Sequence, residues 1–402
     1  MKKFLVFAAL AIAAPAVAAP WEFAPAIDIV PATGKKVFHH LDAGNRRHIA
    51  VSDDTVAVVW EDNRDGTPRA YVATKSANEI AFGSPRLVSG EVAAYDPVIV
   101  ALTKGRFLIG WEEGDAIWVR QLDAHGMRPP AALATDAGQV SLARVDDKHI
   151  AVVWSQRQGN HRQIRISTLE IGGPGNTILA GNTRLVDPNA PDAEQQYPSV
   201  AAVGGQRTVA WEDRRRGHTV LYVSHAPDGK KFNVPTALNE VPPKRSDVYG
   251  KGTGVMRVSL VPHGERGVAA IWLDKRELAV GYDVYAGFSA DGGKQFGPNE
   301  KVQDDFGNNI TQWHAAIGAN RKGVVAAAWD DDREGNADIW LSWRGAEGWS
   351  DDLAVPGASG PGQQEAPAIA IDEAGNLHLI WIERADPNAP TRLRYVYGRY
   401  VD

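Results

Sequence analysis

The segment NNITQWHAAIG places an amide, a large aromatic ring and an imidazole side by side, in Gln312, Trp313 and His314. Aromatic rings stack on the faces of sugars, while amides, guanidinium groups and carboxylates hydrogen-bond to hydroxyl groups. Other connecting segments contain the same kinds of group, and their candidates for a ligand site are Arg47, Tyr197, Arg257 and Glu365. The simpler interpretation, that these residues only line a solvated funnel, stays open at this point.

A second set of arginines belongs to a repeated motif, W-x-D-x-R, found in VAVVWEDNRDG (56–66), RTVAWEDRRRG (207–217), VAAIWLDKR (268–276) and VAAAWDDDREG (325–335). Guanidinium groups bind carboxylates in a bidentate fashion, so Arg64 and Arg276 are also ligand-binding candidates. One asymmetric ligand rarely needs the same group four times. We therefore expect the motif as a class to be structural, with the aspartate capping its own turn and the arginine pairing with it or with the neighbouring repeat.

Other kinds of chemistry find little support in the sequence. The chain contains no cysteine, which excludes disulfides and thiol chemistry. His39 and His40 are adjacent, so on a strand they point to opposite faces, and no third metal ligand follows at a recognisable spacing. We expect no metal site and no cofactor.

The elements that position the candidates follow from an internal repeat. Aligning the apolar runs on their final tryptophan gives Trp60, Trp111, Trp154, Trp211, Trp272, Trp329 and Trp381, with spacings of 51, 43, 57, 61, 57 and 52 residues. Units of this size, with alternating apolar residues and glycine-rich turns, fit four short strands each. The sequence therefore predicts an all-β, seven-bladed β-propeller. A six-bladed propeller with one irregular unit is the alternative.

The two ends of the chain predict how the ring closes. The last unit ends with RLRYVYGRY (392–400), one strand short of four, and the mature N-terminus begins with WEFAPAIDIV (21–30). We expect the N-terminal segment to supply the missing outer strand of the last blade, which would remove an exposed edge. Residues 19–402 would then form a single domain.

Residues 1–18 are typical of a secretory signal peptide, with two lysines, a short apolar run and small residues before Ala18. We therefore expect a periplasmic or secreted protein with no membrane span. The formal charge of −6 and the absence of a long basic run argue against a nucleic-acid partner.

The segment SADGGKQF (289–296) fits the S-x-D-x-G-x-x-aromatic pattern of the Asp-box, also called the BNR repeat, and APDGKKF (226–232) is a weaker version. Together with the W-x-D-x-R units, it makes the chain resemble the sialidase-like (Asp-box/BNR-repeat) β-propeller family. In that family the Asp-box is a folding element between the third and fourth strands. Its residues are therefore not candidates for the site.

The resemblance also implies what a retaining sialidase would need: three arginines for the substrate carboxylate, a tyrosine nucleophile with a glutamate partner, and an aspartic acid/base. Arg47, in RHIA (47–50), matches the family's first arginine motif only in part, because the aromatic and proline residues of that motif are missing. Arg64 resembles the second arginine, and Arg257 and Arg276 are the candidates to complete the clamp. No tyrosine stands out as a nucleophile, so the sequence predicts no catalytic set.

The leading hypothesis is therefore an exported propeller that binds a ligand, with a glycan as the first candidate. One alternative is a carbohydrate-active enzyme, in particular a glycoside hydrolase of the exo-sialidase type. Another is a scaffold for a second exported protein, because a propeller fold does not determine function.

Overall fold

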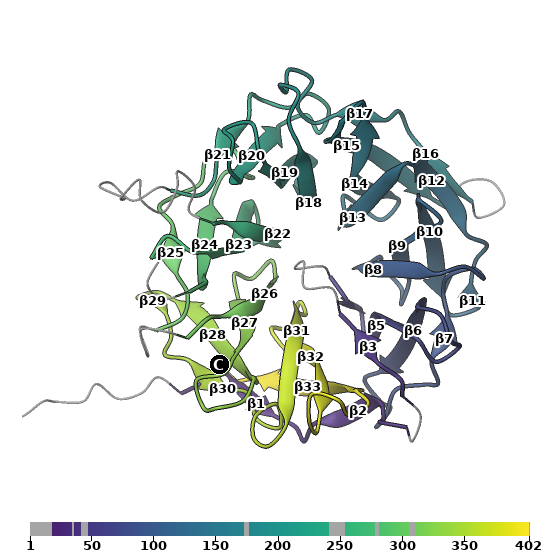
Figure 1. Cartoon of the computed structure of the whole chain (residues 1–402), viewed down its shortest axis with the longest axis vertical. Helices are drawn as coiled ribbons and strands as arrows, with labels where there is room; N and C mark the ends of the chain where they lie inside the picture. Colours follow the sequence, from purple (N-terminus) through teal and green to yellow (C-terminus); the bar gives the residue numbers. More distant parts are fainter. Residues whose placement is uncertain are drawn as a thin grey trace, which may run out of the picture.

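The computed structural model describes residues 18–33, 36–41, 47–172, 177–240, 254–277, 281–304 and 310–401. Every regular element in these ranges is a β-strand. The strands form seven small sheets arranged in a ring (Figure 1), so the protein is a seven-bladed β-propeller and the six-bladed alternative is wrong. Within the same ranges, no helix is long and apolar enough to cross a membrane. Residues 1–17 of the predicted signal peptide lie outside the described residues.

Each blade is a meander of antiparallel strands that runs outward from the central axis. The innermost strands of blades 1 to 7 are β4 (Ile49–Ser52), β8 (Ala94–Ala101), β13 (Ala137–Arg144), β18 (Gln195–Val203), β22 (Met256–His263), β26 (Trp313–Ala319) and β31 (Gln363–Ile371). The second strands are β5 (Thr55–Asp62), β9 (Phe107–Glu113), β14 (His149–Gln158), β19 (Gln206–Asp213), β23 (Gly267–Asp274), β27 (Val325–Asp331) and β32 (Leu377–Arg384).

The outer half of each blade is less regular than the inner half. The third strands are β6 (Arg69–Ser76), β10 (Ala116–Asp123), β15 (His161–Ile171), β20 (Val220–Ala226), β24 (Asp283–Ser289), β28 (Asp338–Gly345) and β33 (Arg392–Tyr400). The outermost strands of blades 1 to 6 are β7 (Arg86–Leu87), β11 (Gly126–Met127), β12 (Ala131–Thr135), β16 (Ile178–Ala180), β17 (Arg184–Leu185), β21 (Thr236–Ala237), β25 (Glu300–Lys301), β29 (Gly348–Trp349) and β30 (Leu353–Ala354). A further short strand, β3 (His39–His40), pairs with β5.

The N-terminal strands complete blade 7, as the sequence predicts. Both β1 (Trp21–Phe23) and β2 (Ile27–Val30) pair antiparallel with β33, which pairs on its other side with β32. The register places Trp21 opposite Tyr400 and Ile27 opposite Tyr395. The edge of β33 is therefore covered, and the two ends of the chain are held in one sheet.

The seven repeated tryptophans form the core between the blades, and they are the largest fully buried side chains of the described chain. In most blades the residue two positions later accepts a hydrogen bond from the indole N–H, because side chains alternate along a strand and the two lie on the same face. These bonds are Trp60–Asp62 (2.8 Å), Trp111–Glu113 (2.8 Å), Trp154–Gln156 (3.3 Å), Trp211–Asp213 (2.9 Å), Trp272–Asp274 (3.1 Å) and Trp329–Asp331 (3.0 Å).

The segment 289–296 forms the turn between β24 and β25, where the sequence places it. Ser289 Oγ lies 2.7 Å from Asp291 Oδ1 and accepts the Gly293 N–H at 2.9 Å. Thr208 of blade 4 donates its hydroxyl hydrogen to the Gly292 carbonyl at 2.6 Å. This turn ties one blade to the next and lies away from the candidate residues for the ligand site.

Candidate functional site

Six of the seven innermost strands contain the same irregularity near their first residues. The pairing with the second strand shifts register there, and the residue at the shift has a positive φ of 49° to 61° although it is not glycine. Non-glycine residues avoid this conformation, and bulges with such strain concentrate at functional sites. The residues concerned are Asp96, Gln139, Tyr197, Arg257, His314 and Ala366.

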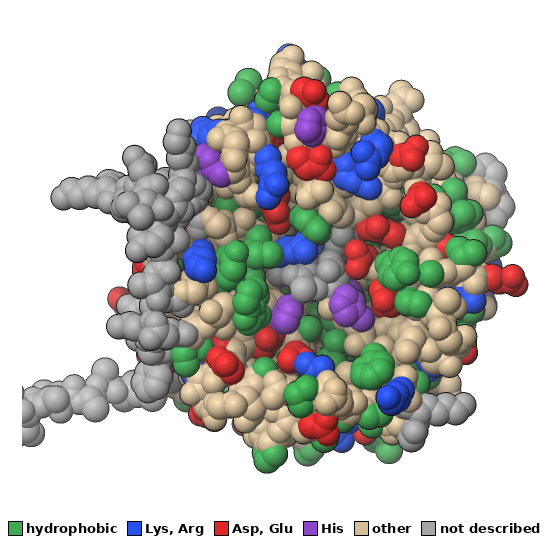
Figure 2. Space-filling view, in the orientation of Figure 1, with side chains coloured by type: hydrophobic (Ala, Val, Ile, Leu, Met, Phe, Trp, Pro, Cys, Tyr) green, Lys and Arg blue, Asp and Glu red, His purple; other side chains and the backbone are tan. Residues whose placement is uncertain are grey.

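This bulge brings three of the candidates to one structural position. Tyr197, Arg257 and His314 start the innermost strands of blades 4, 5 and 6, beside the ends of the second strands. They surround one end of the central channel. Figure 2 shows histidine, basic and carboxylate side chains around the central hollow of the face it displays.

The bulges are held by polar side chains from the preceding blade. The residue directly after the repeated tryptophan accepts the N–H of the bulge residue: Glu212 accepts that of Arg257 at 2.9 Å, and Glu112 accepts that of Gln139. Between blades 3 and 4 the acceptor of the Tyr197 N–H is the Gln139 side chain, at 2.9 Å. These bonds satisfy backbone groups that the bulge removes from the strand ladder.

Blades 4 and 5 meet at the stacked pair of Tyr197 and Arg257. The guanidinium carbon of Arg257 lies 3.5 Å from the centre of the Tyr197 ring, a close cation–π contact. Glu212 lies behind this pair, and its burial raises the pKa of its carboxyl group. A buried carboxyl group with a raised pKa is a common property of proton donors in active sites.

Blades 5 and 6 meet at a second aromatic pair. The rings of Tyr282 and Trp313 have their centres 5.3 Å apart, and Trp313 is 40% exposed, which is unusual for so large an apolar side chain. Burial, followed by the nearby charge of Glu212, raises the pKa of Tyr282. Tyr282 therefore packs on the exposed ring of Trp313 within the electrostatic influence of Glu212.

His314, which follows Trp313 in the chain, forms a hydrogen bond with the carboxylate of Asp330. Its Nδ1 lies 2.6 Å from Oδ1 of Asp330, and the same oxygen accepts the N–H of Ala366 at 2.9 Å. Asp330 is buried and fixes the imidazole ring at the edge of the channel. The result is a polar group of defined orientation beside an exposed aromatic plane.

Two further candidates lie at the same end of the ring, but their polar groups are already bonded to neighbouring protein groups. Glu365 forms an ion pair with Arg384 of the same blade, with oxygen–nitrogen distances of 3.0 and 2.8 Å. Gln312 is buried, donates to the Ile310 carbonyl and accepts from Gln303. Glu365 is partly exposed beside the site, whereas Gln312 supports the start of β26 from inside.

The structure holds Arg64 and Arg276 apart from this group. Arg276 bonds to Asp274 (2.5 Å) and to Asn299 (2.8 Å), and it stacks on Tyr285 of the third strand of its own blade (3.9 Å). Arg64 is held in the same way, by Asp62 and by the Tyr71 ring at 4.4 Å. The W-x-D-x-R motif has the structural role expected of it, and these two arginines do not join Arg257 in a clamp.

Arg47 lies deeper than the other candidates, within the channel. It lines a small cavity together with Tyr197 and residues of the innermost strands of blades 2 to 5. Its guanidinium group donates to backbone carbonyls of blades 3, 4 and 5.

The sequence reasoning missed the residues that hold the site from behind, chiefly Glu212, Tyr282 and Asp330. A signal for two of them was present, because alternation along the second strand turns the residue after each tryptophan to the opposite face. In four units this residue is acidic: Glu61, Glu112, Glu212 and Asp330. Among the described residues, no group of three or more His, Asp or Glu side chains could hold a metal ion.

The fold and site together define a seven-bladed β-propeller with polar and aromatic side chains at one end of its central channel. We call this end, which includes Tyr197, Arg257, Trp313 and His314, the axial face. No protein-family model matches the chain, and no curated protein matches its sequence. Among solved structures, a protein of unknown function from Dyadobacter fermentans has a similar fold, with a TM-score of 0.55 and 13% identity over 95% of this chain and 99% of that chain.

Two proteins of known activity are similar at about the same level. The acylaminoacyl peptidase of Pyrococcus horikoshii matches with a TM-score of 0.50 and 12% identity, over 89% of this chain and 50% of that one. The sialidase of Trypanosoma rangeli matches with a TM-score of 0.49 and 12% identity, over 78% of this chain and 56% of that one. At such low identity the likeness concerns the fold alone.

Proposed function

We propose that the protein is exported and binds a glycan at the axial face, in the part of the site formed by blades 4 to 6. The observation that carries the proposal is the exposed Trp313 ring, which packs on Tyr282 and lies directly beside the His314–Asp330 pair. A flat apolar ring next to fixed polar groups suits a sugar, whose faces are apolar and whose edge carries hydroxyl groups. Residues 1–18 support export.

The charge of the site favours a neutral, polyhydroxylated glycan over a polyanion. Glu212, Asp330 and Glu365 supply the negative charges of this region, and the cations near them are Arg257, Arg384 and Lys275, whose ammonium nitrogen lies 5.7 Å from the centre of the Tyr282 ring. Arg384 is already paired with Glu365, and Arg257 is stacked on Tyr197. With as many carboxylates as cations, the site offers no surplus positive charge to a carboxylate-rich ligand.

Binding of neutral pentose and hexose oligosaccharides, with a sialoside as the acidic comparison, tests the proposal by calorimetry. Trp313→Ala should weaken binding roughly tenfold or more, because covering a large apolar side chain contributes about 1.5–3 kcal/mol. The matched control is Tyr95→Ala, which removes an exposed ring at the corresponding position of blade 2. Unchanged affinity in Trp313→Ala, with a folded protein, would refute this site.

A glycoside hydrolase is the second candidate function, and the buried Glu212 favours it. Its raised pKa keeps a larger fraction of the carboxyl group protonated at neutral pH, as a general acid requires. The test is release of free sugar from the same oligosaccharides by the wild type and by Glu212→Gln. Release that the variant abolishes would establish the enzyme, whereas binding without release by the wild type would leave the lectin-like function.

A further inference from the structure

Arg47 crosses the central channel from blade 1 to the opposite side of the ring. Its Nη1 donates to the carbonyl of Leu142 at 3.3 Å, and its Nη2 to those of Val200 (3.4 Å) and Leu260 (2.5 Å). These carbonyls belong to the innermost strands of blades 3, 4 and 5. The guanidinium group is thus fixed against the innermost strands of blades 3 to 5.

In the described part of the chain, the positive charge of Arg47 has no acidic partner. Within the described residues, no carboxylate lies at ion-pair distance from its guanidinium group, and the acceptors of its hydrogen bonds are all backbone carbonyls. Burial of a charge without an opposite charge is costly. Burial lowers the pKa of Arg47 to about 10, so the group still carries its charge at neutral pH.

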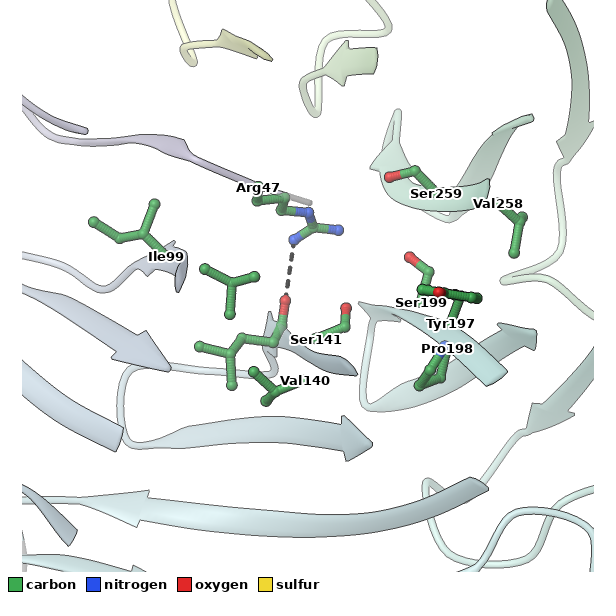
Figure 3. Close-up of a pocket in the computed structure, with 11 residues that line it drawn as sticks. Arg47, Ile99, Val140, Ser141, Tyr197, Pro198, Ser199, Val258 and Ser259 are labelled. Carbon is green, nitrogen blue, oxygen red and sulfur yellow. Dashed lines mark hydrogen bonds between the residues drawn. The ribbon is translucent and has the colours of Figure 1, made fainter. Parts of the chain in front are cut away.

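A small cavity lies directly beside the guanidinium group. The cavity has a volume of about 20 Å³, which is enough for one water molecule or one small ion. Apolar side chains form part of the wall, and Ser141, Ser199 and Ser259 occupy the same position in the innermost strands of blades 3, 4 and 5. Figure 3 shows the three hydroxyl groups around the space that Arg47 faces.

Two of these hydroxyl groups accept hydrogen bonds from the backbone of the next blade. Ser199 Oγ accepts the N–H of Leu260 at 2.9 Å, and Ser141 Oγ accepts the N–H of Val200 at 3.4 Å. A hydroxyl group has one hydrogen to donate besides its lone pairs. Because the backbone N–H groups use the acceptor side, the hydroxyl hydrogens are available for the cavity.

We propose that this cavity binds a single small monovalent anion of about halide size, held by the Arg47 guanidinium group and the serine hydroxyl groups. The cavity is too small for a sulfate or a sugar carboxylate, and its wall combines a positive charge with hydroxyl groups that can donate to an anion. Arg47 also lines a much larger cavity of about 790 Å³ on the other side of the channel. The charged lining of that cavity is mixed: Arg321 pairs with Glu373 (3.9 Å) and Arg144 with Asp147 (2.5 Å), and Lys322 and Glu265 also line it. This wide opening gives a small anion access to Arg47.

The probe for this site is bromide. The thermal midpoint of the mature protein is measured while millimolar sodium bromide or chloride replaces sodium gluconate at constant ionic strength. A specific site stabilises the folded state in a saturable way, so the midpoint should rise and then level off. In crystals grown with bromide, an anomalous peak should lie between Arg47 and Ser199.

Two variants make the test decisive. Arg47→Met should abolish the response, and Ser259→Ala, which leaves the guanidinium group in place, should weaken the anion affinity roughly tenfold. The matched control is Ser52→Ala on β4, whose hydroxyl group donates to the Leu102 carbonyl outside the cavity. A flat response in the wild type, an equal loss in Ser52→Ala, or bromide only at surface positions would overturn the proposal. Trp313→Ala should keep the full response, which separates this site from the glycan site.

Discussion

Oδ1 of Asp330 accepts two hydrogen bonds at once, from Nδ1 of His314 (2.6 Å) and from the backbone N–H of Ala366 (2.9 Å). His314 belongs to the same blade as Asp330, whereas Ala366 begins the innermost strand of the next blade. One carboxylate oxygen therefore orients a group of the candidate site and also holds two blades together.

This double role predicts that Asp330 and His314 differ in their effect on stability. Asp330→Ala should lower the free energy of unfolding by about 1–3 kcal/mol, because it leaves a buried backbone N–H without an acceptor. His314→Asn should change it little, since asparagine tolerates the positive φ of 49° at this position, yet it should weaken glycan binding. Urea unfolding and calorimetry measure the two effects, and a large stability loss in His314→Asn would contradict the assignment.

The arginines of the chain should fall into two functional groups. Arg257→Asn should weaken glycan binding because Arg257 lies at the channel mouth on Tyr197. Arg64→Ala should leave the affinity unchanged, because Arg64 is held by Asp62 and Tyr71. The measurement is the dissociation constant of each folded variant for the same oligosaccharide. Equal losses in both variants would mean that the W-x-D-x-R arginines also reach the ligand.

The aspartate of the W-x-D-x-R motif should be a main contributor to blade stability. Asp213 is buried and accepts bonds from Trp211 (2.9 Å), Gln195 (3.0 Å) and Arg215 (2.7 Å). Asp213→Ala should therefore cost about 3–5 kcal/mol, the typical loss when one partner of a buried ion pair is removed. The control is Asp187→Ala, which removes the second carboxylate partner of Arg215 (2.8 Å) and leaves Asp213 in place. A loss no greater than that of the control would refute this role.

The junction of blades 5 and 6 should make stability depend on pH. Burial, with the charge of Asp304 nearby, raises the pKa of Asp352 to about 7, although Arg333 lies 2.7 Å away and opposes the shift. Because the folded pKa exceeds the ordinary value of 3.8, the folded state favours the protonated form. The stabilising effect is complete only below the unfolded pKa, and it is lost as the pH rises toward and through 7.

The change in the free energy of unfolding between mildly acidic and mildly basic pH isolates this effect. The wild type should lose about 1–2 kcal/mol more than Asp352→Asn over this interval, because the amide does not ionise. Other titrating groups are common to both proteins and cancel in the comparison. Parallel pH profiles would show that Asp352 ionises with its ordinary pKa.

The N-terminal strand should be necessary for the closed ring. Trp21 donates its indole N–H to the Gly375 carbonyl at 2.9 Å, and its ring meets the edge of Trp343 at 6.0 Å. Trp21→Ala should cost about 3–5 kcal/mol, as for other buried large rings. Glu22→Ala, which alters an exposed residue of the same strand, should change the free energy of unfolding little. Near-equal values for the two variants would mean that β1 adds little to blade 7.

Much of the architecture could be predicted from the sequence because it rests on local repetition. Each tryptophan follows an alternating apolar strand, and the shortage of one strand at the C-terminus predicted the partner at the N-terminus. The motif aspartates were predictable for the same reason, since the residue two positions after the tryptophan lies on the same face. The pairing of β1 and β2 with β33 confirms the predicted closure.

The assembly of the site was harder to predict because it depends on contacts between blades. Candidates such as Tyr197 and Arg257 are 60 residues apart, and only the shared bulge places them in contact. Tyr282 reaches Trp313 from the turn of another blade. Arg64 and Arg276 were candidates because of their residue type, and nothing in the local pattern shows that their own aspartates and aromatic rings hold them.

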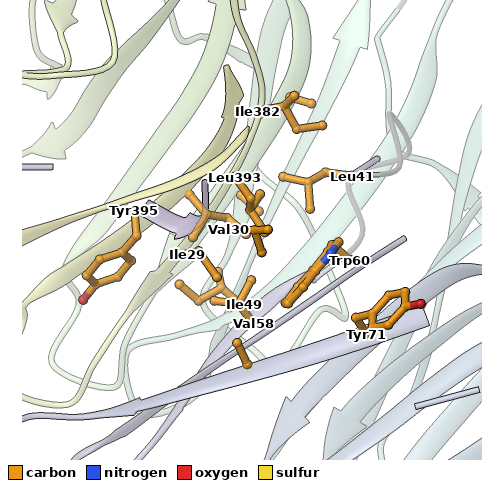
Figure 4. Close-up of a cluster of buried hydrophobic side chains, with 14 of the residues drawn as sticks. Ile29, Val30, Leu41, Ile49, Val58, Trp60, Tyr71, Ile382, Leu393 and Tyr395 are labelled. Atoms are coloured by element: carbon orange, nitrogen blue, oxygen red, sulfur yellow. The ribbon is translucent and has the colours of Figure 1, made fainter. Parts of the chain in front are cut away.

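The closure of the ring has a consequence for how the chain folds. Ile29 and Val30, from the beginning of the chain, pack with Leu393 and Tyr395 from its end and with Trp60 in one buried cluster (Figure 4). Contacts of such large sequence separation form slowly, because the loop between them must first lose its freedom. Blades 1 to 6 each consist of one continuous stretch of chain and can form as synthesis proceeds. Blade 7 cannot form until the last strand exists, so until then the newly made chain presents an open arc with two unpaired edges, and it is in this interval that it most needs protection from aggregation.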